Sequence, residues 1–151
     1  MHSIFIRGIP GSGKTTLAKK INAQLHATRH FEADMWMVDN DGNYKFDPAK
    51  LKYCHQKCFD CFKDALNNGF NVIVANTFVK RWEIAPYLDH CKRNRINYII
   101  IRCTNNFDNV HGVPSEKVFN MKRNFEDLNM PELMYDISDE SFMSILNEKK
   151  F

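Results

Sequence analysis

Two patterns of apolar residues alternate along the chain. Nearly continuous apolar runs predict strands covered on both faces, at residues 3–7, 71–77 and 96–103, and a shorter run predicts another at 30–33. Between these runs, apolar side chains recur at helical spacing. We therefore expect helices at residues 14–25, from 48 to about 68, at 84–94 and from 114 onward.

The alternation of strands with helices predicts the fold class. It is typical of an α/β fold, a parallel sheet sandwiched between helices, with the ligand at the carboxyl ends of the strands. The second helix carries its expected buried side at five positions, Leu51, Cys54, Cys58, Phe62 and Ala65.

Glycine and proline mark the expected helix ends. Gly69 closes the second helix, and Pro86 is tolerable only in a first turn, so we begin the third helix at Ile84. The helix that begins at Pro114 shows an apolar side of Val118, Met121, Phe125 and Leu128. Residues 128–151 form a tail that we expect to contain a last short helix.

The spacing of small residues after the first strand predicts a phosphate-binding loop. Gly8, Gly13, Lys14 and Thr15 satisfy the pattern of glycine, four residues, glycine, lysine and then serine or threonine, between a strand and a helix. Glycines let several backbone N–H groups converge on a phosphate where a Cβ would obstruct them. A chance glycine turn before a helix is the alternative, which the matching context disfavours.

This loop predicts the nucleotide contacts. Lys14 reaches the β- and γ-phosphates, and the Thr15 hydroxyl ligates a magnesium ion that bridges them. The expected nucleotide-binding residues are Gly8, Pro10, Gly11, Ser12, Gly13, Lys14, Thr15 and Thr16. The predicted ligands are therefore ATP and Mg²⁺, with Thr15 as the metal residue.

Polar residues after two further strands are candidates for the chemistry. Asp34 follows the second predicted strand, where a carboxylate can accept the proton of an attacking hydroxyl. The alternative is that Asp34 caps a short helical turn. Asn76 and Thr77 end the next strand and either position a substrate or simply begin a loop.

Four ordered motifs carry a family resemblance. They are "GIPGSGKTT", "FEADMW" followed by "DGNYKFDP", "VIVANTF" followed by "WEIAPYL", and "HGVPSEKVFNMKRNFE". Together they resemble the phage polynucleotide kinase type of P-loop kinase and its small ATP-binding relatives. The resemblance extends over about residues 3–127.

The resemblance implies a P-loop kinase fold with a parallel sheet of four or five strands in three layers. It also implies magnesium-ATP as the donor and transfer of the γ-phosphate to a hydroxyl, in polynucleotide kinases the 5′-hydroxyl of DNA or RNA. By position, Lys14 and Thr15 match the phosphate and magnesium residues, and Asp34 matches the general base. Asn76 falls where an acidic or amide residue contacts the acceptor.

Two arginines of those kinases have no counterpart here. Met37 stands where an arginine holds the acceptor's phosphate, and residues 104–113, the expected lid, contain no lysine or arginine. A lid arginine contributes about 10³–10⁵ to the rate. Substitutes that we consider, against the alternative of ordinary solvated charges or lid hydrogen bonds, are Arg102, His111, Lys117, Lys122 and Arg123.

Composition sets limits on these interpretations. The chain has 151 residues, 44 % of them apolar and 13 % aromatic, which predicts one domain over residues 1–151. A net charge of +3 permits a nucleic-acid partner without demonstrating one. No apolar run approaches the length of a membrane span and no leader is evident, so we expect a cytoplasmic protein, in the host cytoplasm if the source is a phage.

Two other clusters favour ordinary interpretations. Cys54, His55, Cys58 and Cys61 lie inside a helical pattern, so core thiols are expected there and no structural zinc. The chain has five cysteines, an odd number, which suits a reducing compartment where they stay thiols. The basic groups near Trp82 and at residues 92–95 either contact a phosphate backbone or form the wet face of a helix.

The sequence thus predicts a kinase and leaves two alternatives. One is a kinase for a nucleoside or another small metabolite, and the other is a nucleotide-binding module that controls a partner without productive transfer. The physiological acceptor, the choice between DNA and RNA, and the oligomeric state stay open.

Overall fold

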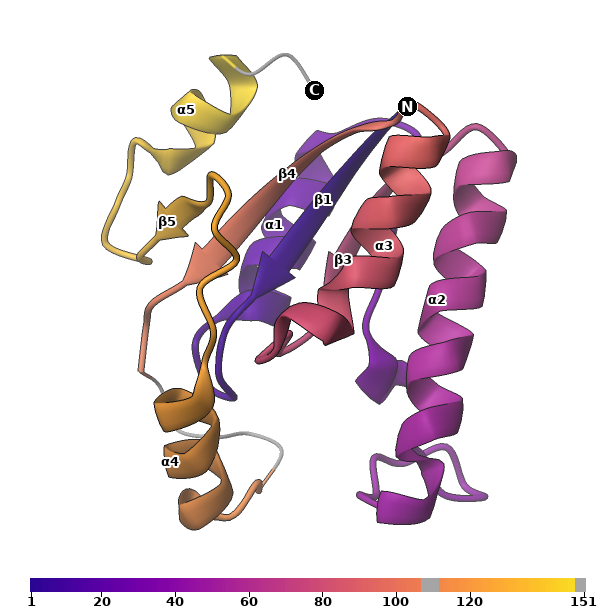
Figure 1. Cartoon of the computed structure of the whole chain (residues 1–151), viewed down its shortest axis with the longest axis vertical. Coiled ribbons are helices and arrows are strands. Elements are labelled where there is room, and N and C mark those ends of the chain that lie inside the picture. The colour runs from indigo at the N-terminus through magenta and orange to yellow at the C-terminus, as the bar shows by residue number, and fades with distance from the viewer. Residues whose placement is uncertain (107–111, 149–151) are drawn as a thin grey trace.

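The structure is a computed structural model that describes residues 1–106 and 112–148 (Figure 1). Five parallel strands form one sheet in the order β2-β3-β1-β4-β5. They are β1 (His2–Arg7), β2 (Thr28–Phe31), β3 (Asn71–Ala75), β4 (Asn97–Cys103) and β5 (Leu133–Tyr135). Ile4 of β1 pairs with Ile73 of β3 and with Ile99 of β4, so β1 is the central strand.

Helices cover both faces of this sheet. They are α1 (Lys14–Gln24), α2 (Leu51–Asn67), α3 (Arg81–Arg93), α4 (Ser115–Asn124) and α5 (Phe142–Glu148), with the 3₁₀ turns η1 (Ala33–Trp36) and η2 (Pro48–Lys50). α2 and α3 pack on one face, and α1 and α5 pack on the other. The α4 and η2 helices extend beyond the carboxyl ends of the strands on opposite sides (Figure 1). The expected three-layer α/β fold is confirmed.

Alternating side chains of β1 belong to two separate hydrophobic cores, one on each face of the sheet. Phe5 points to the α2/α3 side, where its ring centroid lies 5.7 Å from that of Phe62 and 5.8 Å from that of Tyr87. Ile4 and Ile6 point to the other side and pack among the residues of α1 and α5. Every residue from Ser3 to Arg7 is buried, because helices cover the strand on both faces. Its sequence therefore lacks the alternation of apolar and polar residues that a half-exposed strand shows.

Several expected boundaries were wrong. The strand predicted at residues 30–33 is β2, which ends at Phe31, and the third helix begins at Arg81 instead of Ile84, with Pro86 inside it. Leu51, expected to be buried, is 39 % exposed, because it lies in the first turn of α2 at the end of the molecule. The helix after Pro114 ends at Asn124, so Phe125 and Leu128 belong to the segment that follows it.

The tail does more than form a helix. It contributes β5 as an edge strand, in which Leu133 pairs with Ile101 of β4, before the short helix α5. The buried side chains of Phe142 and Leu146 in α5 then join the core around Ile4. Residues 128–148 are therefore integrated with the sheet. No helix in the described ranges is long and apolar enough to cross a membrane.

A buried arginine ties the tail to the centre of the sheet. Arg7 is fully buried at the carboxyl end of β1, and its guanidinium donates to the Phe78 carbonyl, to the Glu126 carbonyl and to the Glu132 carboxylate at 2.8–3.1 Å. The guanidinium also lies over the ring of Phe125, at 4.0 Å from its centroid. The segment after α4 is thus held against the strand that leads into the predicted phosphate loop.

We expect replacement of Arg7 by Met to destabilise the fold strongly. The change leaves the Glu132 carboxylate, which is only 11 % exposed, and two carbonyls without their donor. Loss of one partner of a buried ion pair costs about 3–5 kcal/mol, which corresponds to a fall in Tm of roughly 6–20 °C in a domain of this size. Thermal unfolding followed by circular dichroism measures the change.

Arg93→Met is the matched control, because Arg93 is exposed at the end of α3. Its Tm should stay close to that of the wild type. The double variant Arg7→Met/Glu132→Gln should recover part of the loss, since it removes the uncompensated charge. An Arg7→Met protein as stable as the Arg93→Met control would contradict the assigned role.

Candidate active site

The loop between β1 and α1 folds as the spacing predicts. The Gly8 N–H donates to the Thr77 carbonyl after β3, and the Ser12 N–H donates to the Ile9 carbonyl, both at 3.2 Å. Gly11 and Gly13 adopt positive φ angles of 80° and 93°, which glycine reaches without strain. Gly13 is the N-cap of α1, so the positive end of that helix faces the loop.

The loop is too tight for a side chain at its first position. A Cβ on Gly8 would lie 2.3 Å from Ser12 Oγ and 3.0 Å from the Cys103 carbonyl oxygen. Ser12 is fully buried, and within the described residues its Oγ has no hydrogen-bond partner. A buried hydroxyl without a partner is costly, so it suits a cradle that is completed by a bound anion.

Lys14 lies beside this cradle. Its Nζ donates to the Ile9 carbonyl at 2.9 Å, which curls the side chain back over the loop. Burial lowers the pKa of Lys14, while the carboxylates of Glu32 and Asp34 oppose that fall. The lysine, Glu32 and Asp34 therefore share one electrostatic environment, and a phosphate bound there would stabilise the charged lysine.

Glu32 is a site residue that the sequence analysis missed. Its carboxylate accepts a hydrogen bond from Thr15 Oγ1 at 3.0 Å and contacts His30 Nε2 at 2.9 Å. Glu32 follows the last residue of β2, and we had placed it inside the predicted strand at 30–33. The available signal was an acidic residue among apolar ones at the end of a parallel strand.

The pair of Thr15 and Glu32 fits a magnesium ion. Both supply oxygen atoms, and Mg²⁺ in nucleotide sites is usually held by one or two carboxylates, a hydroxyl and the phosphates of the substrate. Glu32 is only 9 % exposed, so its charge is little screened by solvent. The donor set therefore agrees with the metal that the loop motif predicts.

Asp34 lies two residues after Glu32, in η1, and is exposed. Its carboxylate affects two neighbours: burial raises the pKa of both Tyr44 and Cys54, and the charge of Asp34 raises each further. The turn η1, which carries Asp34, packs against α2. Met37, at the end of the same turn, is buried and 1 % exposed.

Asn76 connects β3 with the Asp34 turn. Its Oδ1 accepts a hydrogen bond from the Ala33 N–H at 2.9 Å, and its Nδ2 lies 3.6 Å from Cys58 Sγ. Burial raises the pKa of the Cys58 thiol to about 11, so this sulfur stays protonated. Asn76 thus holds the backbone next to Asp34, while the neighbouring Thr77 supplies its carbonyl to the loop.

The predicted substitutes for a lid arginine are not brought together. Arg102 is half-buried, lies 4.5 Å above the Phe125 ring and forms an ion pair with Asp127 at 3.6 Å. Lys122 and Arg123 are exposed in the last turn of α4, and Lys117 is exposed on the same helix, with its Nζ 4.8 Å from the centroid of the Phe46 ring. His111 lies outside the described residues.

Asn105 is a second residue that the sequence analysis did not single out. It is 8 % exposed just after β4, and its Nδ2 donates to the Ser12 carbonyl at 3.2 Å. Its Oδ1 accepts from the Ile137 N–H at 3.0 Å. Asn105 therefore links the loop to the segment after β5. Because its bond with Ser12 joins residues 93 positions apart, no local pattern in the sequence predicts it.

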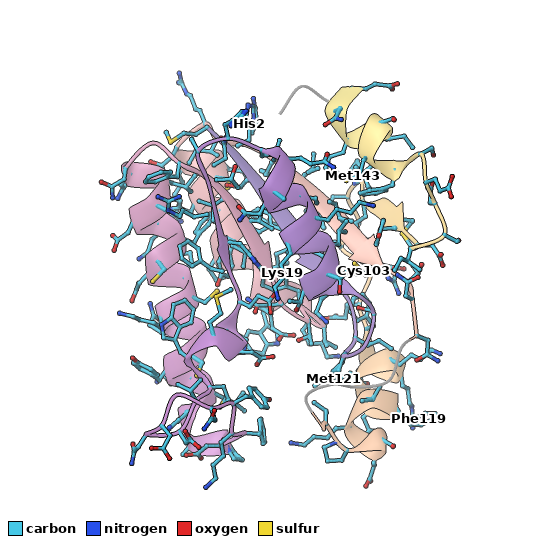
Figure 2. The ribbon with its side chains drawn as sticks, turned by 180° about the vertical axis from the view of Figure 1, so that it is seen from behind. His2, Lys19, Cys103, Phe119, Met121 and Met143 are labelled. Atoms are coloured by element: carbon cyan, nitrogen blue, oxygen red, sulfur yellow. The ribbon has the colours of Figure 1, made fainter. Side chains whose placement is uncertain are left out.

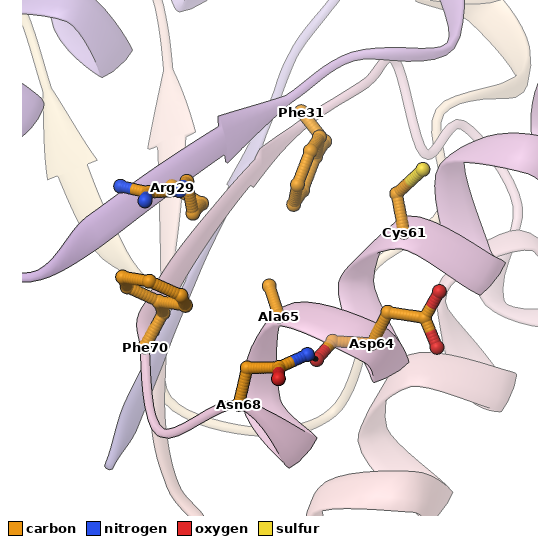
Figure 3. Close-up of a pocket in the computed structure, with 7 residues that line it drawn as sticks. All are labelled: Arg29, Phe31, Cys61, Asp64, Ala65, Asn68 and Phe70. Carbon is orange, nitrogen blue, oxygen red and sulfur yellow. Dashed lines mark hydrogen bonds between the residues drawn. The ribbon is translucent and has the colours of Figure 1, made fainter.

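A surface cavity of about 220 Å³ lies away from this site (Figure 3). It lies between the edge strand β2 and the carboxyl-terminal part of α2, with Arg29 placed over the ring of Phe70 at 3.8 Å. Phe70 immediately precedes β3, so this end of the cavity is at the amino ends of the strands. A second cavity of about 450 Å³ lies between α2 and α3, beside Phe59 and His90.

Comparison with known proteins adds a family match. The model of the AAA domain family matches residues 4–107, which include the loop, Glu32, Asp34 and Asn76. Human NEDD4-binding protein 2 is 25 % identical over 134 residues, which are 82 % of this chain and 8 % of that protein. The chain thus spans less than a tenth of the length of this relative.

Solved structures share the fold across the whole chain. The structure of APE1195 aligns with a TM-score of 0.63 at 15 % identity and covers 99 % of this chain and 95 % of that one. The Mycobacterium tuberculosis APS kinase CysC in complex with AMPPNP and APS aligns with a TM-score of 0.60 at 13 % identity, over 99 % and 98 % of the two chains. At these identities the likeness concerns the fold alone.

We expect replacement of Asn76 by Ala to destabilise the protein by about 1–3 kcal/mol, because it leaves the buried Ala33 N–H without an acceptor. Chemical denaturation measures the change. Asn67→Ala, at an exposed position of α2, is the control and should be nearly neutral. Equal stabilities of the two variants would show that the Asn76 bond does not hold the Asp34 turn.

Proposed function

Because this chain belongs to the AAA domain family, we propose that it binds magnesium-ATP at residues 8–16 and transfers the γ-phosphate to a hydroxyl group. The proposed acceptor is the 5′-hydroxyl of a polynucleotide. The observation that carries the proposal is the meeting of Lys14, Thr15 and Glu32 beside a tight glycine loop that has no room for a Cβ at its first position. The structural likeness to a kinase in complex with AMPPNP supports it.

The loop would hold the donor. The amides from Gly11 to Thr16, at the positive end of α1, converge on the β-phosphate, with Pro10 fixing the entry to the turn. Lys14 Nζ exchanges the Ile9 carbonyl for phosphate oxygens, and Ser12 Oγ gains an acceptor. Lys14 thereby exchanges a neutral acceptor for a charged one, and Ser12 gains a charge-assisted hydrogen bond.

Thr15 and Glu32 would hold the magnesium ion, Thr15 through its hydroxyl and Glu32 directly or through water. The ion supplies neutralisation of the charge that develops on the transferred phosphoryl group. His30 keeps Glu32 oriented through the contact with its other carboxylate oxygen.

Asp34 would act on the acceptor. Asp34 and Glu32 both follow β2, and the exposed carboxylate of Asp34 orients or deprotonates the attacking hydroxyl. Asn76 fixes the turn that carries Asp34 through the Ala33 N–H, and Thr77 follows Asn76 in the loop after β3. Positioning of this kind is the main contribution of a protein to phosphoryl transfer.

A nucleotide-binding module with slow or no transfer is the second candidate. It is favoured by the sequence of residues 104–113, which lacks lysine and arginine, and by Arg102, whose charge is paired with Asp127. Lys122 and Arg123 on α4, together with His111, are the groups that could replace the lid arginine on closure of α4. Without such a cation the rate falls by about 10³–10⁵.

An acceptor screen tests these proposals. The protein is incubated with γ-labelled ATP, magnesium and a panel of 5′-hydroxyl DNA and RNA oligonucleotides, nucleosides and sugars. Label on the oligonucleotides supports the proposed function, and label only on a small compound shows a metabolite kinase. Tight ATP binding with no labelled acceptor shows the nucleotide-binding module.

For Asp34→Asn we predict a loss of about 10²–10⁴ in the transfer rate, because the amide cannot accept the proton. ATP binding, measured by calorimetry, should stay within a few-fold of the wild type. Lys14→Ala should instead weaken both binding and transfer. If Asp34→Asn transfers phosphate at the wild-type rate, the assignment of Asp34 as the base is wrong.

For Glu32→Gln we predict that about 10-fold more magnesium is needed to reach half of the maximal stabilisation by ATP. The amide preserves the shape of the side chain and its bond with Thr15, but removes the negative charge. A thermal-shift titration with magnesium at fixed ATP measures this. Glu140→Gln, at an exposed position of the tail, is the control, and an equal magnesium requirement in both variants would contradict the role of Glu32.

A further inference from the structure

The segment between η1 and η2 forms a small, firmly hydrogen-bonded hairpin. Val38 and Tyr44 form an antiparallel bridge, and the Asp39 N–H donates to the Asn43 carbonyl at 2.8 Å. The Asp39 carboxylate closes the turn by accepting from the N–H groups of residues 41 and 43. Lys50 Nζ donates to the Val38 carbonyl at 2.8 Å, which attaches the hairpin to η2.

This hairpin presents two aromatic side chains to solvent. Tyr44 is 36 % exposed and Phe46 is 44 % exposed, although Met37 at the base of the hairpin is buried. Lys45 stands between the two aromatic residues in the chain, and its N–H donates to the Met37 carbonyl. This hydrogen bond fixes the backbone that carries both rings. Exposed aromatic rings on a preorganised backbone form a surface for a flat apolar ligand, since little ordering entropy is lost on binding.

The hairpin lies on the acceptor side of the site. The Met37 N–H donates to the Asp34 carbonyl at 3.1 Å, and the Lys45 N–H donates to the Met37 carbonyl at 3.0 Å, so the hairpin is attached to the turn that carries the proposed base. On the opposite side, Lys117 of α4 reaches across and places its Nζ 4.8 Å from the centroid of the Phe46 ring. The contact spans the two parts of the chain that extend beyond the carboxyl ends of the strands (Figure 1).

We propose that Tyr44 and Phe46 form a stacking platform for a nucleobase of a single-stranded polynucleotide whose 5′-hydroxyl is the acceptor. The proposal rests on the proposed function and names the part of the substrate that this surface binds. Every nucleobase has a face that stacks on an aromatic ring, so such a platform binds strands without strict sequence preference. Lys45 and Lys117 supply positive charge beside it for the phosphates of the strand.

The open form of this surface favours a strand over a small metabolite. Sites for small molecules usually enclose most of the ligand, whereas Tyr44 and Phe46 lie at the exposed rim of the site. A nucleotide strand needs only its reactive end in the centre, while the following bases remain outside and stack. The combination of aromatic rings with adjacent lysines is typical of surfaces that bind single strands.

The first experiment measures binding without catalysis. Fluorescence anisotropy follows a short 5′-hydroxyl oligonucleotide labelled at its 3′ end, in low salt, with wild type, Tyr44→Ala and Phe46→Ala. We expect each variant to bind roughly 5- to 150-fold more weakly, the range for loss of one stacked base. ATP affinity, measured separately by calorimetry, should be unchanged.

The chain offers matched controls for both substitutions. Phe119 is 64 % exposed on α4, and Figure 2 shows it on the side of that helix that faces away from the sheet, while Met121 lies on the side toward it. Phe119→Ala is therefore the control for Phe46→Ala. Tyr53 is 58 % exposed on α2, and Tyr53→Ala is the control for Tyr44→Ala.

A second probe isolates the base from the phosphates. An oligonucleotide with abasic sites near its 5′ end keeps the backbone charge but has no ring to stack. Wild type should bind it about as weakly as Tyr44→Ala/Phe46→Ala binds the normal strand, and this double variant should show no further loss. Equal losses in wild type and the double variant, or an effect of Phe46→Ala no larger than that of Phe119→Ala, would overturn the platform.

The outcomes separate this proposal from the function on which it rests. If oligonucleotides accept label but Tyr44 and Phe46 are dispensable for binding them, the platform is refuted and the polynucleotide kinase stands. If only nucleosides or sugars accept label, the polynucleotide acceptor and the platform both fail. Label on oligonucleotides, together with base-dependent binding through Tyr44 and Phe46, supports both.

Discussion

The pairing of β1 with a parallel neighbour on each side is the constraint on which this protein depends. Because β3 and β4 flank it in register, the residues that follow all three strands arrive at one edge of the sheet. There the Gly8 amide meets the Thr77 carbonyl, and the absent Cβ of Gly8 leaves room for Ser12 and the Cys103 carbonyl. The bare loop is thus fixed from both sides before any ligand arrives.

The cationic side chains near the carboxyl ends of the strands have two kinds of role, structural and, under the proposed function, catalytic. Arg7 and Arg102 both lie against the ring of Phe125 and bind carboxylates of the segment after α4, so their charges hold the fold together. Lys14, near Glu32 and Asp34, is the cation that the proposed function assigns to the phosphates. Under that proposal, further positive charge at the transferred phosphoryl group would come from exposed groups of α4 such as Lys122 and Arg123.

Local patterns in the sequence predicted the loop, its helix and four of the strands, because each of these features is determined by residues that are close together in the sequence. β5 was missed, since its three residues become a strand only by pairing with β4. Glu32 was missed because the end of β2 depends on its pairing with β3. The partners of Arg7 and of Asn76 lie far away in the sequence, and only the folded chain identifies them.

The central claim is that backbone amides, with Lys14 beside them, grip a triphosphate. Isothermal titration calorimetry of ATP into the wild-type protein at saturating magnesium tests it most directly. The account predicts saturable uptake close to one ATP per chain, which is strongly weakened in Lys14→Ala. A wild-type protein that is fully folded and yet takes up neither ATP nor GTP would contradict the account.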